Sequence, residues 1–177
     1  MAMEGAILWA ILLLLFVTIQ RGAELVYANY NTRRLRTAGA TEVGAGHYPL
    51  IVLLHGAWLI ALWLWVLSGD VELQLWAVGA YLVLQAFRVW ILASLGSFWT
   101  TRVIIPAEAP PLVRRGPYRF CQHPNYVLVV LEIALLPLAL GAWPLAVIFS
   151  IANALLLAWR IHVEEAALTP RRPRSTT

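Results

Sequence analysis

The chain has 177 residues, of which 61% are hydrophobic and 12% are charged, and its mean hydropathy is +0.74. A soluble domain carries about 25% charged residues, so this composition excludes a water-soluble globule. The net charge is only +4, and the charges are too few and too dispersed for a nucleic-acid-binding surface. The single cysteine, Cys121, excludes an intramolecular disulfide and a four-cysteine zinc site.

Five apolar runs predict membrane-spanning helices, because about 20 apolar residues span a bilayer. We therefore expect an all-α integral membrane protein with about five transmembrane helices. A single domain of residues 1–170 would hold them, followed by a disordered tail at 171–177. In chain order the runs cover residues 5–19, 48–67, 73–95, a fourth from Tyr126 and a fifth ending near Trp159, with turns at 68–70 and 141–144.

The arginines predict the orientation in the membrane, since cytoplasmic loops carry the excess of basic residues. They follow the first, third and fifth runs, whereas the other side receives Glu4, Asp70 and Glu72 and no arginine. We expect a multi-pass protein of the bacterial inner membrane, with the N-terminus outside and the C-terminus in the cytosol. The arginines assigned to the cytosolic side are Arg21, Arg33, Arg34, Arg36, Arg102, Arg114, Arg115, Arg119, Arg160, Arg171, Arg172 and Arg174.

The segment 96–124 is the longest without a spanning pattern, and loops of this length are usually functional or disordered. Its apolar residues, including Phe120, predict that it folds back against the helix ends. Pro124 suits the first turn of the fourth helix, which places His123 at the N-cap. Two interpretations are open for His123: it caps the helix, or it takes part in binding an anion at the helix N-terminus.

Arg160 and Glu164 lie four residues apart on the last predicted helix and therefore share a face. They form a solvated surface pair in one interpretation. In the other, they converge with the helix start at His123 in one site, because both groups emerge at the same membrane surface.

Glu132 is the one carboxylate well inside a predicted span, and intramembrane charges are functional hypotheses by default. Arg88 lies at a similar depth in the third run, so we expect the two to pair across helices. The pair either serves folding alone or also contacts substrate. His55 and Cys121 have no second ligand at metal-binding spacing, so we expect both to be packing residues and no metal to bind.

The C-terminal half resembles the isoprenylcysteine carboxyl methyltransferase family of integral-membrane methyltransferases. The resemblance covers about the last 80 residues and depends on Gly116-Pro117-Tyr118, His123-Pro124-Asn125-Tyr126, and Arg160 followed by the sequence Glu-Glu-Ala-Ala-Leu at 164–168. It implies S-adenosyl-L-methionine as cofactor, in a pocket closed by the cytosolic loop and the C-terminal helix. A lipid acceptor would enter from the bilayer.

By this resemblance, Arg160 contacts the acceptor, and we expect it to be catalytic. For the proton we expect either Glu165 as a catalytic residue or an acceptor that is already deprotonated, and the intramembrane charges of Glu132 and Arg88 make them further candidates for contact with the acceptor. Methyl transfer from a sulfonium needs little beyond in-line alignment and exclusion of water. The implied cofactor contacts are Pro110, Pro111, Leu112, Val113, Tyr118, His123, Pro124, Asn125, Tyr126 and Glu164.

Two positions depart from the family pattern: Gln122 stands where arginine is common, and Leu128 where glycine is common. With Glu132 and the stretch 44–49, the chain looks more like a bacterial branch whose members O-methylate alkylpyrones or alkylresorcinols. We therefore expect an amphiphilic acceptor with an acidic hydroxyl. The alternatives are carboxyl methylation of an isoprenylcysteine, and a non-enzymatic membrane assembly or transport protein.

Overall fold

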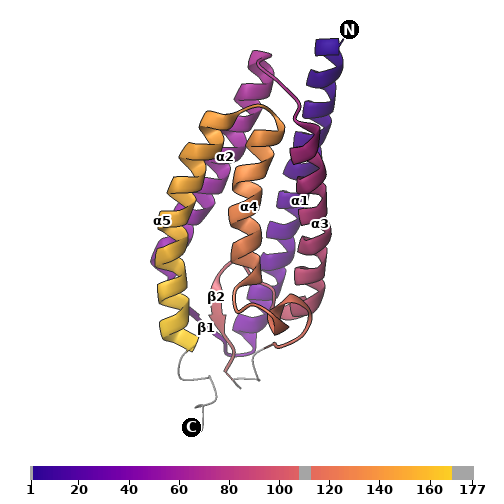
Figure 1. Ribbon diagram of the computed structural model, residues 1–177. Coiled ribbons are helices and arrows are strands. Elements are labelled where there is room, and N and C mark those ends of the chain that lie inside the picture. The colour runs from indigo at the N-terminus through magenta and orange to yellow at the C-terminus, as the bar shows by residue number, and fades with distance from the viewer. Residues whose placement is uncertain (1, 108–112, 169–177) are drawn as a thin grey trace.

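The computed structural model describes residues 2–107 and 113–168, and these form a bundle of five α-helices lying side by side (Figure 1). The predicted tail at 171–177 lies outside the described residues. The helices are α1 (Ala2–Thr37), α2 (Tyr48–Ser68), α3 (Leu75–Leu95), α4 (Pro124–Ala139) and α5 (Trp143–Leu168). The start of α1 and the end of α5 lie at opposite ends of the bundle, and the five predicted helices are confirmed.

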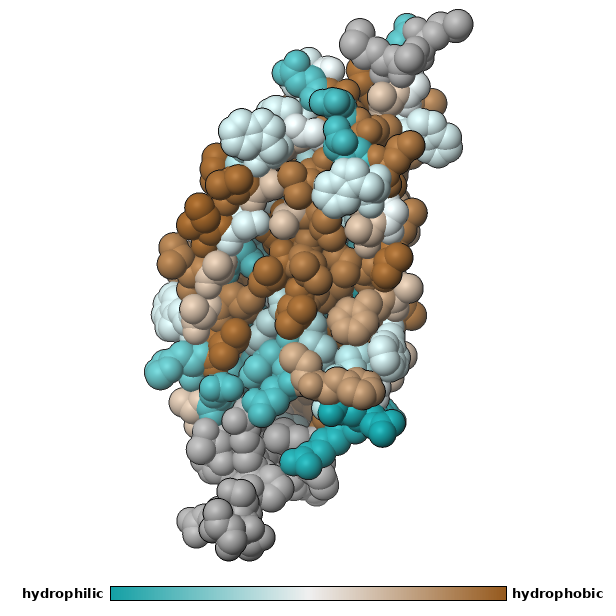
Figure 2. Space-filling model, viewed as in Figure 1, coloured by the Kyte–Doolittle hydropathy of each residue, from teal (hydrophilic) through white to brown (hydrophobic). Residues whose placement is uncertain are grey.

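The bundle has the apolar surface of an integral membrane protein. Among the described residues, α1, α2, α3 and α5 are long and apolar enough to cross a bilayer. The fourth helix has 16 residues, or about 24 Å at 1.5 Å per residue, and packs between α3 and α5. Hydrophobic side chains cover the middle of the visible face, and polar ones gather toward its ends (Figure 2).

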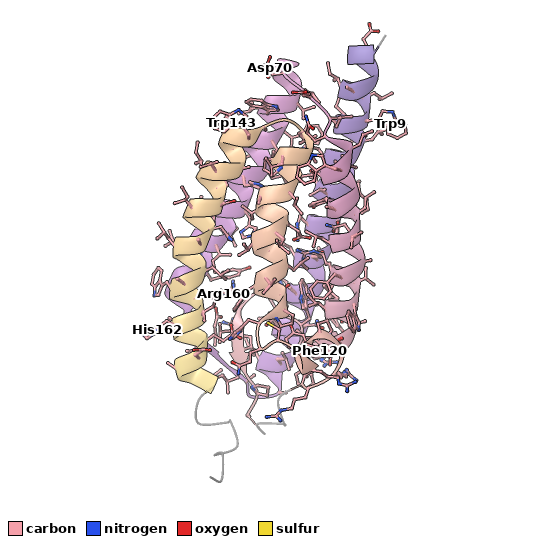
Figure 3. All side chains as sticks on the ribbon, viewed as in Figure 1. Trp9, Asp70, Phe120, Trp143, Arg160 and His162 are labelled. Carbon is pink, nitrogen blue, oxygen red and sulfur yellow. The ribbon has the colours of Figure 1, made fainter. Side chains whose placement is uncertain are left out.

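Two short strands depart from the purely helical expectation. Strand β1 (Thr41–Val43) pairs antiparallel with β2 (Val103–Ile105), and both contain β-branched residues that favour strands. Glu42 joins the flanking segments, because its carboxylate accepts hydrogen bonds from Arg36 and Arg102. We call the end of the bundle that carries these strands the strand end. Arg160, His162 and Phe120 lie toward it, whereas Asp70, Trp9 and Trp143 lie toward the opposite end (Figure 3).

The segment between α3 and α4 folds back against the helices, as expected. The Asn31 side chain of α1 donates a hydrogen bond to the carbonyl of Trp99 at 2.9 Å, and the Trp99 ring stacks on Tyr27. Gly116 has a φ of +58°, and a Cβ there would lie 2.0 Å from the Ser94 hydroxyl oxygen, so only glycine fits this approach to α3. Three turns of 3-10 helix complete the strand end: η1 (Ala45–His47), η2 (Gly96–Phe98) and η3 (Gly116–Arg119).

Two residues of this segment do not pack as expected. Phe120 is 80% exposed and Cys121 is exposed, so the prediction that they are packing residues was wrong. Both follow η3, whose buried residue is Pro117. The close contact of Gly116 with α3 therefore turns the Pro117 side of η3 toward the helices. Phe120 and Cys121, which follow η3, remain exposed.

A buried charge cluster joins α1, α3 and α4 and confirms the predicted pair. Arg88 Nε donates to Glu132 Oε1 at 2.9 Å, and both side chains are almost fully buried. Arg21 Nη2 donates to the other oxygen of Glu132 at 2.8 Å, and Arg88 Nη1 reaches Glu24 at 2.8 Å. Arg88 Nη2 also donates to Glu132, and the side-chain amide of Gln85 donates to it at 3.0 Å. Two arginines thus balance two glutamates inside the bundle.

The position of Arg21 corrects the sequence-based interpretation. We expected Arg21 in a cytosolic segment after the first span, but it binds Glu132 inside the bundle. The reason is that α1 continues without a break to Thr37, so Arg21 lies near the middle of a helix of 36 residues. Such a helix is about 54 Å long, well beyond the thickness of a bilayer core.

Candidate functional site

Three polar side chains converge where α4 and α5 meet at the strand end. Arg160 Nε donates to the Tyr126 hydroxyl at 2.8 Å, and this hydroxyl donates to Glu164. Tyr126 is 8% exposed and lies in the first turn of the helix that starts at Pro124. Arg160 and Glu164 therefore share a face, as their spacing predicts, but Tyr126 bridges them.

The rest of the Arg160 guanidinium is held by the backbone of the loop before β2. Its Nη2 donates to the carbonyl of Thr101 at 2.8 Å, and the Thr101 hydroxyl contacts the Tyr48 hydroxyl at 3.2 Å. In the described part of the chain, the remaining nitrogen, Nη1, has no hydrogen-bond partner. Because two nitrogens are fixed, the third is presented in a defined direction.

His123 occupies the N-cap of α4, but its imidazole does not cap the helix. Instead the ring stacks on Tyr126 at 5.2 Å between centroids. Its Nε2 lies 3.4 Å from Glu165, and its Nδ1 lies 4.0 Å from Glu164. The capping interpretation of the side chain is therefore wrong, and His123 belongs to the cluster of Tyr126 and the two glutamates.

Tyr118 and Asn125 bring further polar groups to this region. Burial, together with the negative charge of Glu164, raises the pKa of the Tyr118 hydroxyl, which keeps it protonated and able to donate. The carboxamide oxygen of Asn125 is buried and has no hydrogen-bond partner in the described chain. Buried polar groups are normally paired, so an orphaned oxygen is a place for a ligand donor.

A cavity of about 280 Å³ opens between the helices next to this cluster. Its size is near the lower end of ordinary small-molecule pockets, which run to about 300 Å³ and above. Apolar side chains form most of its wall, and Arg160 and Tyr126 lie at its border. Its apolar lining includes Leu25, Ile51, Val52, Leu59, Val129, Leu156 and Leu157.

The structure brings together most of the residues that the sequence singled out. Val113 is half-buried in the loop, and the expected contacts at 110–112 lie outside the described residues. Arg88 lines the cavity, whereas the carboxylate of Glu132 is taken up by the charge cluster and does not line it. The residues singled out from the sequence that gather near Tyr126 are Tyr118, His123, Pro124, Asn125, Arg160, Glu164 and Glu165.

Sequence reasoning missed several polar residues of the cavity. Arg21 and Glu24 line it from α1, and Asn153 lines it from α5. His55, which we expected to be a packing residue, also lines it. A polar side chain inside an apolar run was the signal that could have found His55 and Asn153, whereas Arg21 and Glu24 follow the end of the first run. Within the described residues, no three His, Cys, Asp or Glu side chains are grouped for a metal ion.

Comparison with known proteins places the chain in a family. The model of the isoprenylcysteine carboxyl methyltransferase (ICMT) family matches residues 77–170. The chain belongs to this family. A protein of Bacillus subtilis (strain 168), named uncharacterized protein YpbQ, is 38% identical over 160 residues, which cover 89% of this chain and 95% of that protein. No solved structure matches the chain.

Membership in the ICMT family assigns the reaction class. Its members are methyltransferases that use S-adenosyl-L-methionine, so this membrane protein is an enzyme that transfers a methyl group from that donor. The alternative of a non-enzymatic assembly or transport protein is thereby excluded. The matched region includes α4 and α5, which carry Tyr126, Arg160 and Glu164.

Proposed function

We propose that this ICMT-family enzyme O-methylates an amphiphilic acceptor with an acidic hydroxyl, such as an alkylpyrone, an alkylresorcinol or a related phenol or enol. The observation that carries the proposal is the cavity, which joins apolar walls to the polar border at Arg160 and Tyr126. An acceptor chain would lie among the apolar side chains between the helices. Its oxygen would then meet the free Nη1 of Arg160.

The polar groups around Tyr126 fit the cofactor. S-adenosyl-L-methionine, when bound, supplies a methyl group on a positively charged sulfonium. The carboxylate of Glu164 can accept hydrogen bonds from ammonium or ribose groups, and His123 can donate to a carboxylate. The orphaned oxygen of Asn125 offers one more acceptor. Tyr118 and the loop at 110–113 are the further contacts that we propose.

Arg160 would hold the acceptor oxygen and stabilise its negative charge. Its guanidinium is fixed by Tyr126 and Thr101, so it needs little reorganisation as the oxygen attacks. By fixing the acceptor oxygen, Arg160 would orient it for in-line attack on the methyl group that the bound cofactor would supply, with the sulfur as leaving group. The hydroxyl proton passes to Glu165, whose side chain is 44% exposed, or leaves to solvent before the transfer.

The experiment that tests the acceptor class is methyl transfer by the purified enzyme in detergent. With methyl-labelled S-adenosyl-L-methionine, a long-chain alkylresorcinol or alkylpyrone should yield a labelled methyl ether, identified by mass spectrometry. A farnesylcysteine derivative serves as the matched acceptor for carboxyl methylation. A labelled methyl ester from it, with no ether from the hydroxyl acceptors, would replace our proposal by the carboxyl methyltransferase alternative.

We further propose that the strand end faces the cytosol, since it carries the arginines of the last turns of α1 and of the segment after α3. The single cysteine provides a test, because Cys121 is exposed at this end. A membrane-impermeant maleimide should label Cys121 in inverted membrane vesicles and leave it unlabelled in intact cells. The variant Cys121→Ser with Asp70→Cys should show the reverse. Labelling of Cys121 in intact cells would overturn the orientation.

A further inference from the structure

Two polar side chains with unused hydrogen-bonding groups line the cavity deeper in the bundle than Arg160. Asn153 on α5 is 4% exposed and lines the cavity. Its carboxamide makes no hydrogen bond within the described chain, whereas the polar groups of buried residues are normally paired. His55 on α2 lines the same cavity. The site around Tyr126 accounts for neither residue.

The contact of His55 with its own helix defines which ring nitrogen is free. His55 Nδ1 lies 2.8 Å from the carbonyl oxygen of Ile51. A carbonyl only accepts, so Nδ1 carries the proton and donates. In the neutral imidazole, Nε2 then carries a lone pair. In the described chain this nitrogen has no partner, and His55 therefore offers the cavity a hydrogen-bond acceptor.

Helix geometry places His55 and Asn153 at a similar depth. Tyr48 and Arg160 both contact Thr101, so the start of α2 and the end of α5 lie at one level. The two helices run in opposite directions (Figure 1). His55 follows Tyr48 by seven residues and Asn153 precedes Arg160 by seven, which is about 10 Å along either helix.

The His55 imidazole leans back toward Arg160. Helical side chains point toward the N-terminus of their helix, which for α2 is the strand end. The contact with Ile51, one turn nearer the strand end, shows this direction directly. The imidazole of His55 is therefore closer to Arg160 than its helix position alone indicates.

We propose that His55 and Asn153 form a second polar subsite, which binds a second oxygen of the methyl acceptor. This inference rests on the proposed function and narrows its substrate class to a ring with two oxygen functions. One oxygen meets Arg160 and receives the methyl group. A second hydroxyl of the acceptor donates to Nε2 of His55. The carboxamide of Asn153 can donate and accept, and it pairs with this hydroxyl or with an adjacent ring oxygen.

A plain apolar tail does not satisfy these groups. An alkyl or prenyl chain in this part of the cavity would leave Nε2 of His55 and the carboxamide of Asn153 without hydrogen-bond partners. A site built to bond a hydroxyl discriminates strongly against an analogue that lacks it, because its polar groups are then left buried and unpaired. The subsite thus selects a ring with two oxygens over a lipid with a single polar head.

The test compares the binding of two acceptors in detergent without cofactor. We use a long-chain alkylresorcinol and the alkylphenol of equal chain length that lacks the second hydroxyl, and measure their affinities by calorimetry. The wild type should bind the resorcinol about tenfold more tightly or better. His55→Leu and Asn153→Leu should each lower the affinity for the resorcinol about tenfold and leave that for the phenol unchanged.

A control separates this role from a structural one. Leu156→Val changes an apolar lining residue and should affect both ligands equally. Asn153→Leu should keep the melting temperature of the wild type, since the Asn153 side chain makes no hydrogen bond within the described chain that the variant would break. Equal affinities of the wild type for the two ligands, or equal losses of both in the variants, would overturn the subsite. Selective resorcinol binding without methylation would instead overturn the proposed function alone.

Discussion

Replacing Arg160 with lysine is expected to lower kcat for methyl transfer by about 100-fold or more, with little change in cofactor affinity. Arginine holds Tyr126 through Nε and Thr101 through Nη2, and its side chain lines the cavity, where we propose that Nη1 meets the acceptor. A lysine ammonium is a single point charge and cannot make this rigid fork. Removal of one fixed donor to a developing oxyanion costs about 100-fold to 1,000-fold.

A matched arginine elsewhere at the strand end provides the control for Arg160→Lys. Arg36 pairs with Glu42, is half-exposed and does not border the cavity. Arg36→Lys should therefore keep wild-type kcat and cofactor affinity in the same labelled-methyl assay. Unchanged kcat in Arg160→Lys, or a loss explained entirely by weaker cofactor binding, would contradict the role of Arg160 toward the acceptor.

Glu132→Leu should have the largest effect on stability. Its carboxylate accepts from Arg21, Arg88 and Gln85, so the variant leaves charged donors unpaired inside the bundle. Breaking a buried ion pair by removal of one partner costs about 3–5 kcal/mol. Titration with sodium dodecyl sulfate, followed by circular dichroism, should show a lower unfolding midpoint and a smaller free energy of unfolding.

The charge-balanced double variant tests whether the loss comes from the unpaired charge. Arg88→Met with Glu132→Leu leaves Arg21 paired with Glu24, and should recover part of the stability lost in Glu132→Leu. A simple exchange of the two charges should not, because the new arginine at position 132 would face Arg21. A double variant less stable than Glu132→Leu would contradict the account of the cluster.

Much of the fold and of the site could be predicted from local patterns. Apolar runs long enough to span a bilayer predicted the helices, and the buried pair of Arg88 and Glu132 followed from the cost of isolated charge in a membrane. Helical spacing placed Arg160 and Glu164 on one face. These inferences work because helix periodicity and desolvation depend on the sequence nearby.

The parts that could not be predicted depend on contacts between distant segments. The pairing of β1 with β2 joins residues about 60 positions apart, and each strand has only three residues. Arg21 was assigned to a loop because the apolar run ends at position 19, although the helix does not. The bridging role of Tyr126 needs the packing of α4 on α5, and residues of all five helices line the cavity that includes His55.

The central claim is that the cluster around Tyr126 holds the cofactor, and titration calorimetry with S-adenosylhomocysteine in detergent tests it most directly. Glu164→Ala should raise the dissociation constant about tenfold or more, equivalent to about 1.4 kcal/mol, because it removes a charged acceptor. Asp70→Ala at the opposite end should bind like the wild type. Equal affinities of Glu164→Ala and the wild type, or no binding by the wild type, would contradict the claim.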